Sequence, residues 1–285
     1  MIGRPRVSHS QIVRPALRVI CAFCFAVLFV LRALGPASSG LDLSHYRLTF
    51  DERFTSLNIS ASSSSWNANT RWIAHTPWNG DFGDAVFDNP GPDGPFSLTA
   101  NGLRITARKD ALGRWHSGLV CSVDRDGAGQ RGFAQQFGYF EMKAKLPSGP
   151  GVWPAFWLVG VNKKSGSSEI DVLEYYGVGP EYYHNVVHLF KDGKDLLSKD
   201  NMVKVPRESL TDRYNTFGVL IEPDKTTFYL NRNEVWQIDT RPNTISQCMY
   251  SPISLWGAAG RLNSRHLSPW TLPISKSFKQ SREIP

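Results

Sequence analysis

The sequence predicts an all-β domain, built as a sandwich or jelly roll of two antiparallel sheets, and two observations support this. Short strand-like segments recur along the chain and are separated by clusters of Gly, Pro, Asn and Asp, which favour turns. Long helical periodicity is absent beyond the first forty residues. The expected strands cover residues 46–50, 96–98, 103–107, 137–146, 186–190, 216–221, 226–230 and 234–238.

The segment 137–146 shows the clearest alternation of side chains. Phe140, Met142 and Leu146 share one face of an extended chain, whereas Tyr139 and Glu141 share the other. This pattern is typical of an antiparallel strand with one face on a hydrophobic core.

Composition narrows the classes of function. The chain has 285 residues and a formal net charge of +7, with 12% aromatic residues that include nine Trp. Because its Lys and Arg form no stripe interleaved with aromatic residues, we do not expect nucleic-acid binding, whereas an acidic polysaccharide partner stays open. No Cys/His cluster has zinc-ligand spacing. Outside the first forty residues only Cys121 and Cys248 are present, and their pairing is left open.

Residues 1–39 have the order of a secretory signal peptide. Arg14 and Arg18 precede an apolar run over residues 19–31, and small residues follow, with cleavage expected before Gly40. The alternative is an uncleaved membrane anchor, which Arg32 slightly favours. We therefore expect a secreted or periplasmic bacterial protein with no stable membrane association once the leader is cleaved.

The segment 168–176 carries the most informative group of residues. Glu169 and Asp171 share one face of a regular strand, where the next position on that face would be Leu173. A one-residue β-bulge after Asp171 would place Glu174 on the acidic face and bury Leu173. Two carboxyl groups about 5–5.5 Å apart are what a retaining glycosidase needs, one as nucleophile and one as acid/base. A solvated acidic strand or a cation site is the alternative interpretation.

Two tryptophans precede this acidic segment. Trp153 and Trp157 flank Pro154 and Ala155 just upstream of the acids. Aromatic faces stack on the apolar faces of sugar rings, so both are candidate substrate-binding residues, with ordinary core packing as the alternative.

These motifs together resemble glycoside hydrolase family 16, the laminarinase, lichenase and agarase-like group. The resemblance covers roughly residues 45–250. The segments that carry it are residues 48–54, 102–107, 137–147, 153–158, 169–174 and 214–220. It implies a concanavalin A-like β-jelly roll with a concave glycan cleft, and a catalytic domain over residues 40–260.

The resemblance also implies roles for individual residues. Glu169 would be the nucleophile, Glu174 the acid/base and Asp171 the assisting carboxylate. His188 is similar to a histidine that the family places on a neighbouring strand beside these acids. Residues 80–85 and 149–154 look most like the exopolysaccharide glycanases of rhizobia, which depolymerise succinoglycan-type polymers.

The C-terminus departs from the family pattern. Family members usually end on a strand that closes one sheet, and residues 261–285 show no such strand. Losing an edge strand would leave backbone groups unpaired. The tail either substitutes for this strand or is a divergent or frameshifted end that puts stability and activity in doubt.

The function expected from the sequence is an endo-acting retaining glycoside hydrolase that cleaves β-1,3/β-1,4-linked glucan or a bacterial exopolysaccharide. A non-catalytic carbohydrate-binding jelly roll and a transglycosylase are the alternatives. We expect a monomer without an organic cofactor or catalytic metal, with a structural calcium ion left open. Linkage and polymer specificity are not readable from the sequence.

Overall fold

The computed structural model describes residues 41–76, 83–124, 131–149, 152–160 and 166–239, together with the backbone of two later strands. The predicted leader, Cys248, and all of the tail outside 278–280 lie outside the described residues, as do residues 80–82. Within the described part of the chain, no helix has both the length and the apolar character to cross a membrane.

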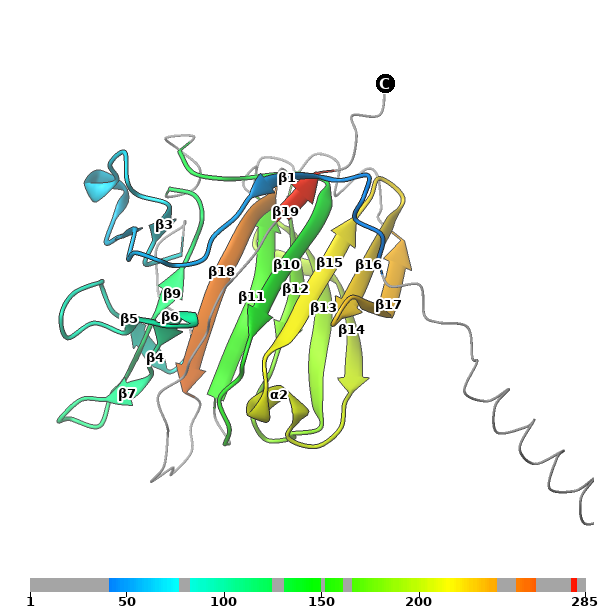
Figure 1. The fold of residues 1–285 in the computed structure, drawn as a ribbon. Coiled ribbons are helices and arrows are strands. Elements are labelled where there is room, and N and C mark those ends of the chain that lie inside the picture. Colours follow the sequence, from blue (N-terminus) through cyan, green and yellow to red (C-terminus); the bar gives the residue numbers. More distant parts are fainter. Residues whose placement is uncertain are drawn as a thin grey trace, which may run out of the picture. The chain divides into compact units, whose positions relative to one another are not determined.

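Two six-stranded sheets form the body of the domain (Figure 1). Along each sheet the neighbouring strands pair antiparallel, which confirms the predicted fold class. The first sheet has the order β1 (Arg47–Phe50), β19 (Phe278–Gln280), β10 (Gly138–Ala144), β15 (Asn215–Ile221), β16 (Lys225–Leu230) and β17 (Asn233–Asp239). The second sheet has the order β14 (Lys194–Lys204), β13 (Tyr182–Lys191), β12 (Ser167–Glu174), β11 (Val152–Gly160), β18 (Tyr250–Ala259) and β9 (Leu119–Val120).

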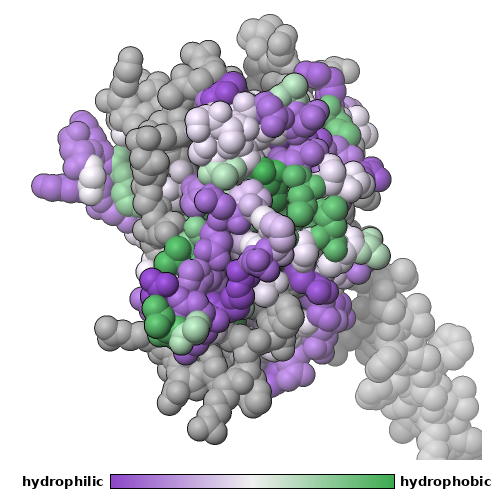
Figure 2. Space-filling model, turned by 90° about the vertical axis from the view of Figure 1, so that its left-hand side faces the viewer, coloured by the Kyte–Doolittle hydropathy of each residue, from purple (hydrophilic) through white to green (hydrophobic). Residues whose placement is uncertain are grey.

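Smaller elements gather beside the β18–β9 edge of the second sheet (Figure 1). They are β2 (Ile59–Ser60) with β3 (Trp72–Ile73), β5 (Phe96–Thr99) with β6 (Gly102–Ile105), and β4 (Ala85–Phe87) with β8 (Trp115–Ser117) and β7 (Arg108–Lys109). Figure 2 shows that this side of the molecule carries mainly hydrophilic residues, with hydrophobic ones in a few separate groups. A 3₁₀ turn at Ser63–Ser65 and helix α2 (Ser209–Asp212) are the helical elements of the described residues.

The main hydrophobic core lies between the two sheets. Phe140 and Met142 project into it from β10, as the alternation of residues 137–146 predicts. The second sheet contributes apolar side chains from β11, β12 and β13, namely Phe156, Leu158, Ile170, Val172, Leu173, Tyr183 and Val187. Burying these side chains is the dominant favourable contribution to folding. The core fixes which face of β12 remains available for polar residues.

The sequence predicts that one face of β10 packs on the core, but in the structure the opposite face, which carries Tyr139 and Glu141, is buried as well. Glu141 is only 3% exposed. Arg232 binds it with two hydrogen bonds, from Nε to Oε2 at 2.7 Å and from Nη2 to Oε1 at 2.9 Å. Tyr139 donates its hydroxyl to the same Oε2 at 3.0 Å. A buried carboxylate needs such partners to offset its lost hydration, so this cluster holds the β16–β17 turn against β10.

The C-terminal tail contributes a strand, which corrects the expectation that residues 261–285 contain none. Strand β19 lies between β1 and β10, where Lys279 is opposite both Leu48 and Tyr139. The tail therefore substitutes for the missing strand and pairs backbone groups of β1 and β10 that an open edge would expose.

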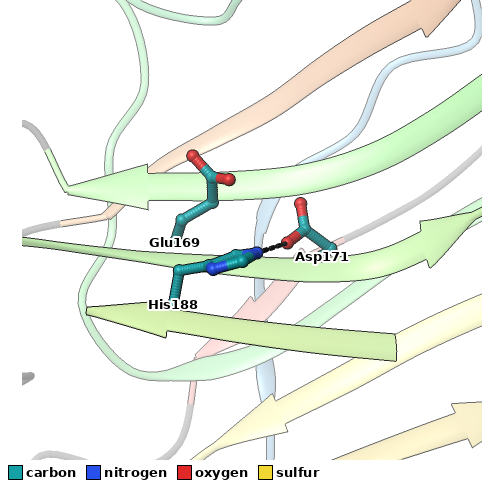
Figure 3. Close-up of side chains that lie close together, drawn as sticks. All are labelled: Glu169, Asp171 and His188. Atoms are coloured by element: carbon teal, nitrogen blue, oxygen red, sulfur yellow. Dashed lines mark ion pairs between the residues drawn. The ribbon is translucent and has the colours of Figure 1, made fainter. Parts of the chain in front are cut away.

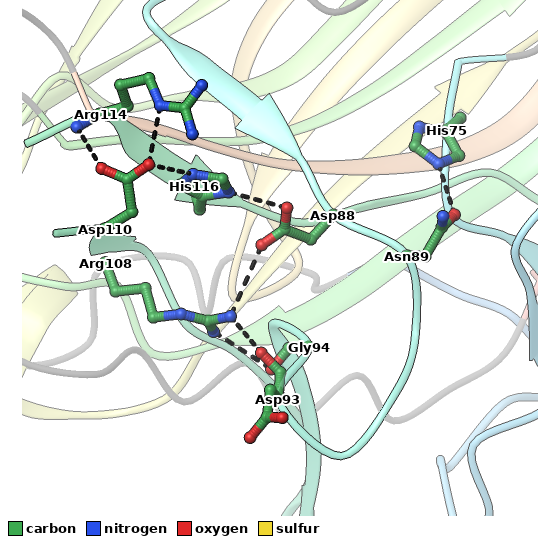
Figure 4. Close-up of polar contacts among 9 residues, drawn as sticks. All are labelled: His75, Asp88, Asn89, Asp93, Gly94, Arg108, Asp110, Arg114 and His116. Atoms are coloured by element: carbon green, nitrogen blue, oxygen red, sulfur yellow. Dashed lines mark hydrogen bonds and ion pairs between the residues drawn. The ribbon is translucent and has the colours of Figure 1, made fainter. Parts of the chain in front are cut away.

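A charged network joins β4 to β8 and to the β7–β8 turn (Figure 4). His116 lies between two carboxylates, with Nδ1 2.8 Å from Oδ1 of Asp88 and Nε2 3.3 Å from Oδ2 of Asp110. Arg114 binds Asp110 through Nε at 2.7 Å, and Arg108 lies 3.6 Å from Asp88. The hydrogen bond to Asp88 is the main reason that the pKa of His116 is raised.

We expect this network to make folding stability depend on pH. Because the pKa of His116 is raised in the folded state, its stabilising effect is fully present below the ordinary histidine pKa of about 6.5 and is lost as pH rises through the raised value. His116→Gln should therefore destabilise the protein by about 1–2 kcal/mol near pH 6 and by much less near pH 9. Thermal unfolding of both proteins across this range is the measurement, and an equal loss at both pH values would contradict the expectation.

Candidate active site

The predicted bulge in β12 is confirmed, and it sets the direction of each acid. Against β13, Asp171 is opposite Val186 and Glu174 is opposite His184, so three residues of β12 span the distance of two on its neighbour. A register shift also occurs against β11. Val172 and Leu173 both turn into the core as a result. Glu169, Asp171 and Glu174 are therefore left on the face that points away from the core.

Burial and mutual repulsion shape the acid–base properties of this face. Burial is the main cause that raises the pKa of Glu169 to about 7, with the His188 charge opposing it and the Glu174 and Asp195 charges adding to it. Asp171 is 5% exposed, and burial, followed by the charges of Glu169 and Glu174, raises its pKa well above the usual range. Since Asp171 is the more deeply buried, it holds its proton more strongly, and Glu169 is the carboxyl that ionises first.

Glu174 is held by two donors on a single oxygen. Trp153 donates Nε1–H to Oε1 at 3.0 Å, and Tyr176 donates its hydroxyl to the same atom at 3.1 Å. Burial raises the pKa of Tyr176, so its hydroxyl stays a donor at neutral pH. These two bonds fix the orientation of the carboxyl group and leave Oε2 as the oxygen that is free to exchange a proton with a ligand.

A second pair of polar residues supports Tyr176 from strands β13 and β14. The Tyr176 ring contacts His184 edge-on, at 5.8 Å between ring centroids. His184 in turn lies with Nδ1 2.8 Å from Oδ1 of Asp200, and Tyr182 packs on the same imidazole at 5.6 Å. The Tyr176 ring beside Glu174 thus packs against His184 of β13, which Asp200 of β14 holds in turn.

The structure places His188 beside the acids, directly opposite Glu169 on β13 (Figure 3). Its Nε2 is 3.7 Å from Oδ2 of Asp171, which is too long for a hydrogen bond, and that buried oxygen has no hydrogen-bond partner. Its Nδ1 is 2.7 Å from Oδ2 of Asp195. Asp195 is itself held by the backbone N–H of Leu197, at 3.2 Å. The imidazole therefore has a fixed orientation, with Nε2 facing the acids.

The two candidate tryptophans occupy different environments. Trp157 is 7% exposed and belongs to a second hydrophobic cluster on the acid-bearing face of β11. The cluster also contains Ala155 and Val159, with Phe87 from β4 and Leu119 from β9. Trp153 is partly exposed at the rim of this cluster, where it binds Glu174. Contact of either ring with a sugar stays a prediction.

An open pocket of about 420 Å³ lies beside Glu169. Its walls come from the ends of β11, β12 and β13 and from the β13–β14 turn: Val159, Gly166, Ser167, Glu169, Phe190, Lys191, Asp192 and Gly193. Solvent or a ligand can therefore reach the carboxyl group of Glu169 from this side.

Sequence reasoning missed four residues of this site: Tyr176, His184, Asp195 and Asp200. The strand β14 that carries two of them is polar and was not expected. The sequence nevertheless carries a signal, because the dipeptide Asp192-Gly193 is typical of a two-residue hairpin turn. In the structure both residues have the positive φ that such a turn requires, 51° and 71°. An Asp-Gly hairpin placed after residues 186–190 would have predicted Asp195 near His188.

The fold and the site define a class of protein: a two-sheet β-jelly roll with two glutamates, an aspartate and a histidine gathered on the outer face of one sheet. Residues 97–270 match the profile of the glycosyl hydrolases family 16. The chain belongs to this family, as the sequence motifs predicted.

Relatives of the chain include two proteins of Rhizobium meliloti (strain 1021). This chain is 27% identical over 234 residues to the endo-1,3-1,4-beta-glycanase EglC and 29% identical over 231 residues to the endo-1,3-1,4-beta-glycanase ExsH. These matches cover 76% and 75% of this chain but 48% and 47% of the relatives, so the chain spans about half of their length. The laminarinase of Rhodothermus marinus shares the fold, with a TM-score of 0.65 over 84% of this chain and 99% of that one, at 16% identity.

Proposed function

We propose that the protein is an endo-acting glycoside hydrolase that cleaves β-1,3/β-1,4-linked glucan or a bacterial exopolysaccharide with retention of anomeric configuration. The observation that carries this proposal is the bulge in β12, which sets Glu169 and Glu174 on one open face with different partners. Glu169 borders a pocket, whereas Glu174 is fixed by two hydrogen-bond donors. Membership of the glycosyl hydrolases and the names of the rhizobial relatives support the substrate class.

In the first step, Glu174 transfers the proton on Oε2 to the glycosidic oxygen while ionised Glu169 attacks the anomeric carbon. The bond from that carbon to the leaving oxygen breaks, and a covalent glycosyl-enzyme forms. In the second step, Glu174 removes a proton from water, the water oxygen attacks the anomeric carbon, and Glu169 leaves as a carboxylate.

Asp171 assists by keeping its proton. Its raised pKa leaves one negative charge, not two, on the pair that it forms with Glu169. A neutral Asp171 neither repels the ionised nucleophile nor competes with it for the anomeric carbon. His188, oriented by Asp195, lies opposite Glu169 on β13 with Nε2 3.7 Å from Oδ2 of Asp171, so it offers positive charge to these carboxyl groups when protonated.

We further propose that the substrate is an acidic exopolysaccharide. The net charge of +7 favours an anionic polymer, and both rhizobial relatives are named as 1,3-1,4-β-glycanases. A polymer of this kind cannot enter a cell, which is why we also propose that the protein acts outside the cytoplasm.

The test is release of reducing ends from laminarin, mixed-linkage β-glucan, agarose and a succinoglycan-type polymer, with the wild-type protein and with Glu169→Gln. We expect cleavage of at least one glucan or of the succinoglycan-type polymer, and loss of that cleavage in the variant. If folded wild-type protein binds these polymers and cuts none, the protein is a carbohydrate-binding jelly roll and the proposal is wrong.

A further inference from the structure

The three residues Glu169, Asp171 and His188 have the donor set of a metal site as well as that of a catalytic centre. One ligand atom from each lies within 4.8 Å of the other two. Two carboxyl groups, both ionised when they bind a metal, and an imidazole suit zinc and similar transition metal ions better than calcium or magnesium, which prefer oxygen ligands alone.

The geometry around His188 is that of a metal-ligating histidine. The carboxylate of Asp195 can only accept a hydrogen bond from Nδ1 of His188, so Nδ1 carries the ring proton. The neutral imidazole then presents the lone pair of Nε2 to the acids. A carboxylate behind the imidazole is the usual support of a histidine that binds a metal, because it fixes the tautomer and the ring orientation. Asp195 and the backbone of Leu197 supply that support here.

Asp171 provides the second, independent observation. Its Oδ2 is buried, has no hydrogen-bond partner and points toward Nε2 of His188 at 3.7 Å (Figure 3). Two ligands that each lie about 2.1 Å from zinc at a tetrahedral angle are about 3.4 Å apart, close to this separation. Glu169 offers a carboxylate oxygen within 4.8 Å of the other two ligand atoms, and the pocket that it borders leaves room for a water ligand.

We propose that Glu169, Asp171 and His188 form a reversible binding site for a divalent transition metal ion, for which Zn²⁺ is the probe. The bound ion would take the carboxylate oxygen of Glu169 that the reaction requires. It would therefore compete with a glycan, a consequence that rests on the proposed function, whereas metal binding itself does not.

Calorimetric titration of the chelator-treated full chain with Zn²⁺ tests the proposal without any measurement of activity. We expect a site of one equivalent that Ca²⁺ and Mg²⁺ do not fill at the same concentrations. Asp195→Asn should weaken binding by about 10- to 100-fold through the loss of its support for the imidazole, and His188→Asn should weaken it at least as much.

The matched control is His184→Asn, which removes a histidine of the same strand that is paired with Asp200 and lies outside the metal site. This variant should bind Zn²⁺ within about twofold of the wild type, well below the effect of losing a supporting residue. Thermal unfolding shows whether each variant folds. If His188→Asn does not fold, Asp195→Asn still tests the proposal, because its side chain is partly exposed. Absence of Zn²⁺ binding by the wild type, or binding that survives in both His188→Asn and Asp195→Asn, would overturn the proposal.

Discussion

Replacing Glu169 by alanine is expected to lower kcat for glycan cleavage by about 10⁴- to 10⁶-fold, the range seen when a covalent nucleophile is removed. The other carboxylate that lines the pocket beside Glu169 belongs to Asp192, which lies in the β13–β14 turn and not on β12, so we do not expect it to replace the nucleophile. The measurement is the rate of reducing-end release at saturating substrate, with the folded state checked by thermal unfolding. The variant should be at least as stable as the wild type at pH 8, because an ionised carboxylate in a mostly buried position is removed.

Azide provides a sharper test of the same variant. A small anion that occupies the space left by Glu169→Ala should attack the anomeric carbon from the nucleophile's side and give a glycosyl azide of inverted configuration. Glu234→Ala is the matched control, since Glu234 is an exposed glutamate on β17 of the other sheet. Near-native activity in Glu169→Ala, or a comparable loss in Glu234→Ala, would contradict the assignment.

Replacing Glu174 by alanine should give the second largest effect, a loss of about 10²- to 10⁴-fold in kcat/KM on a natural glycan, the usual contribution of a general acid. The loss should depend on the leaving group. An aryl glycoside whose phenol leaves readily without a proton should still form the glycosyl-enzyme at a near-normal rate, because Glu169 is untouched. Steady-state rates on glycosides with a series of leaving groups, read together with the pre-steady-state burst, separate the two steps.

Azide again distinguishes the roles. In Glu174→Ala it should accelerate turnover by attacking the glycosyl-enzyme and should yield a glycosyl azide of retained configuration, opposite to the product of Glu169→Ala. An equal loss on good and poor leaving groups would mean that Glu174 has a role other than proton transfer.

The sequence predicted the fold well where local patterns and burial agree. The strands around residues 138–144 and 215–221 follow from alternation because one face of each meets the core. The bulge in β12 was predictable for a related reason: Leu173 must face the hydrophobic core and the three acids must face away from it, and only an added residue satisfies both.

Other features could not be predicted because they depend on contacts distant in sequence. Strand β14 is a polar edge strand whose pairing with β13 comes from the hairpin turn and not from a hydrophobic pattern. The role of Tyr176 arises from its position next to Glu174 and His184, which only the folded sheet brings together. The cover over Glu141 likewise depends on Arg232, ninety-one residues away.

The central claim is that Glu169 and Glu174 act by double displacement, and the configuration of the first product tests it most directly. Proton NMR of a β-glucan digest, recorded within the first minutes, should show the β-anomer of the new reducing end first, with the α-anomer growing only by mutarotation. Initial release of the α-anomer would contradict the account, because it would require direct attack by water and leave no place for Glu169 as a nucleophile.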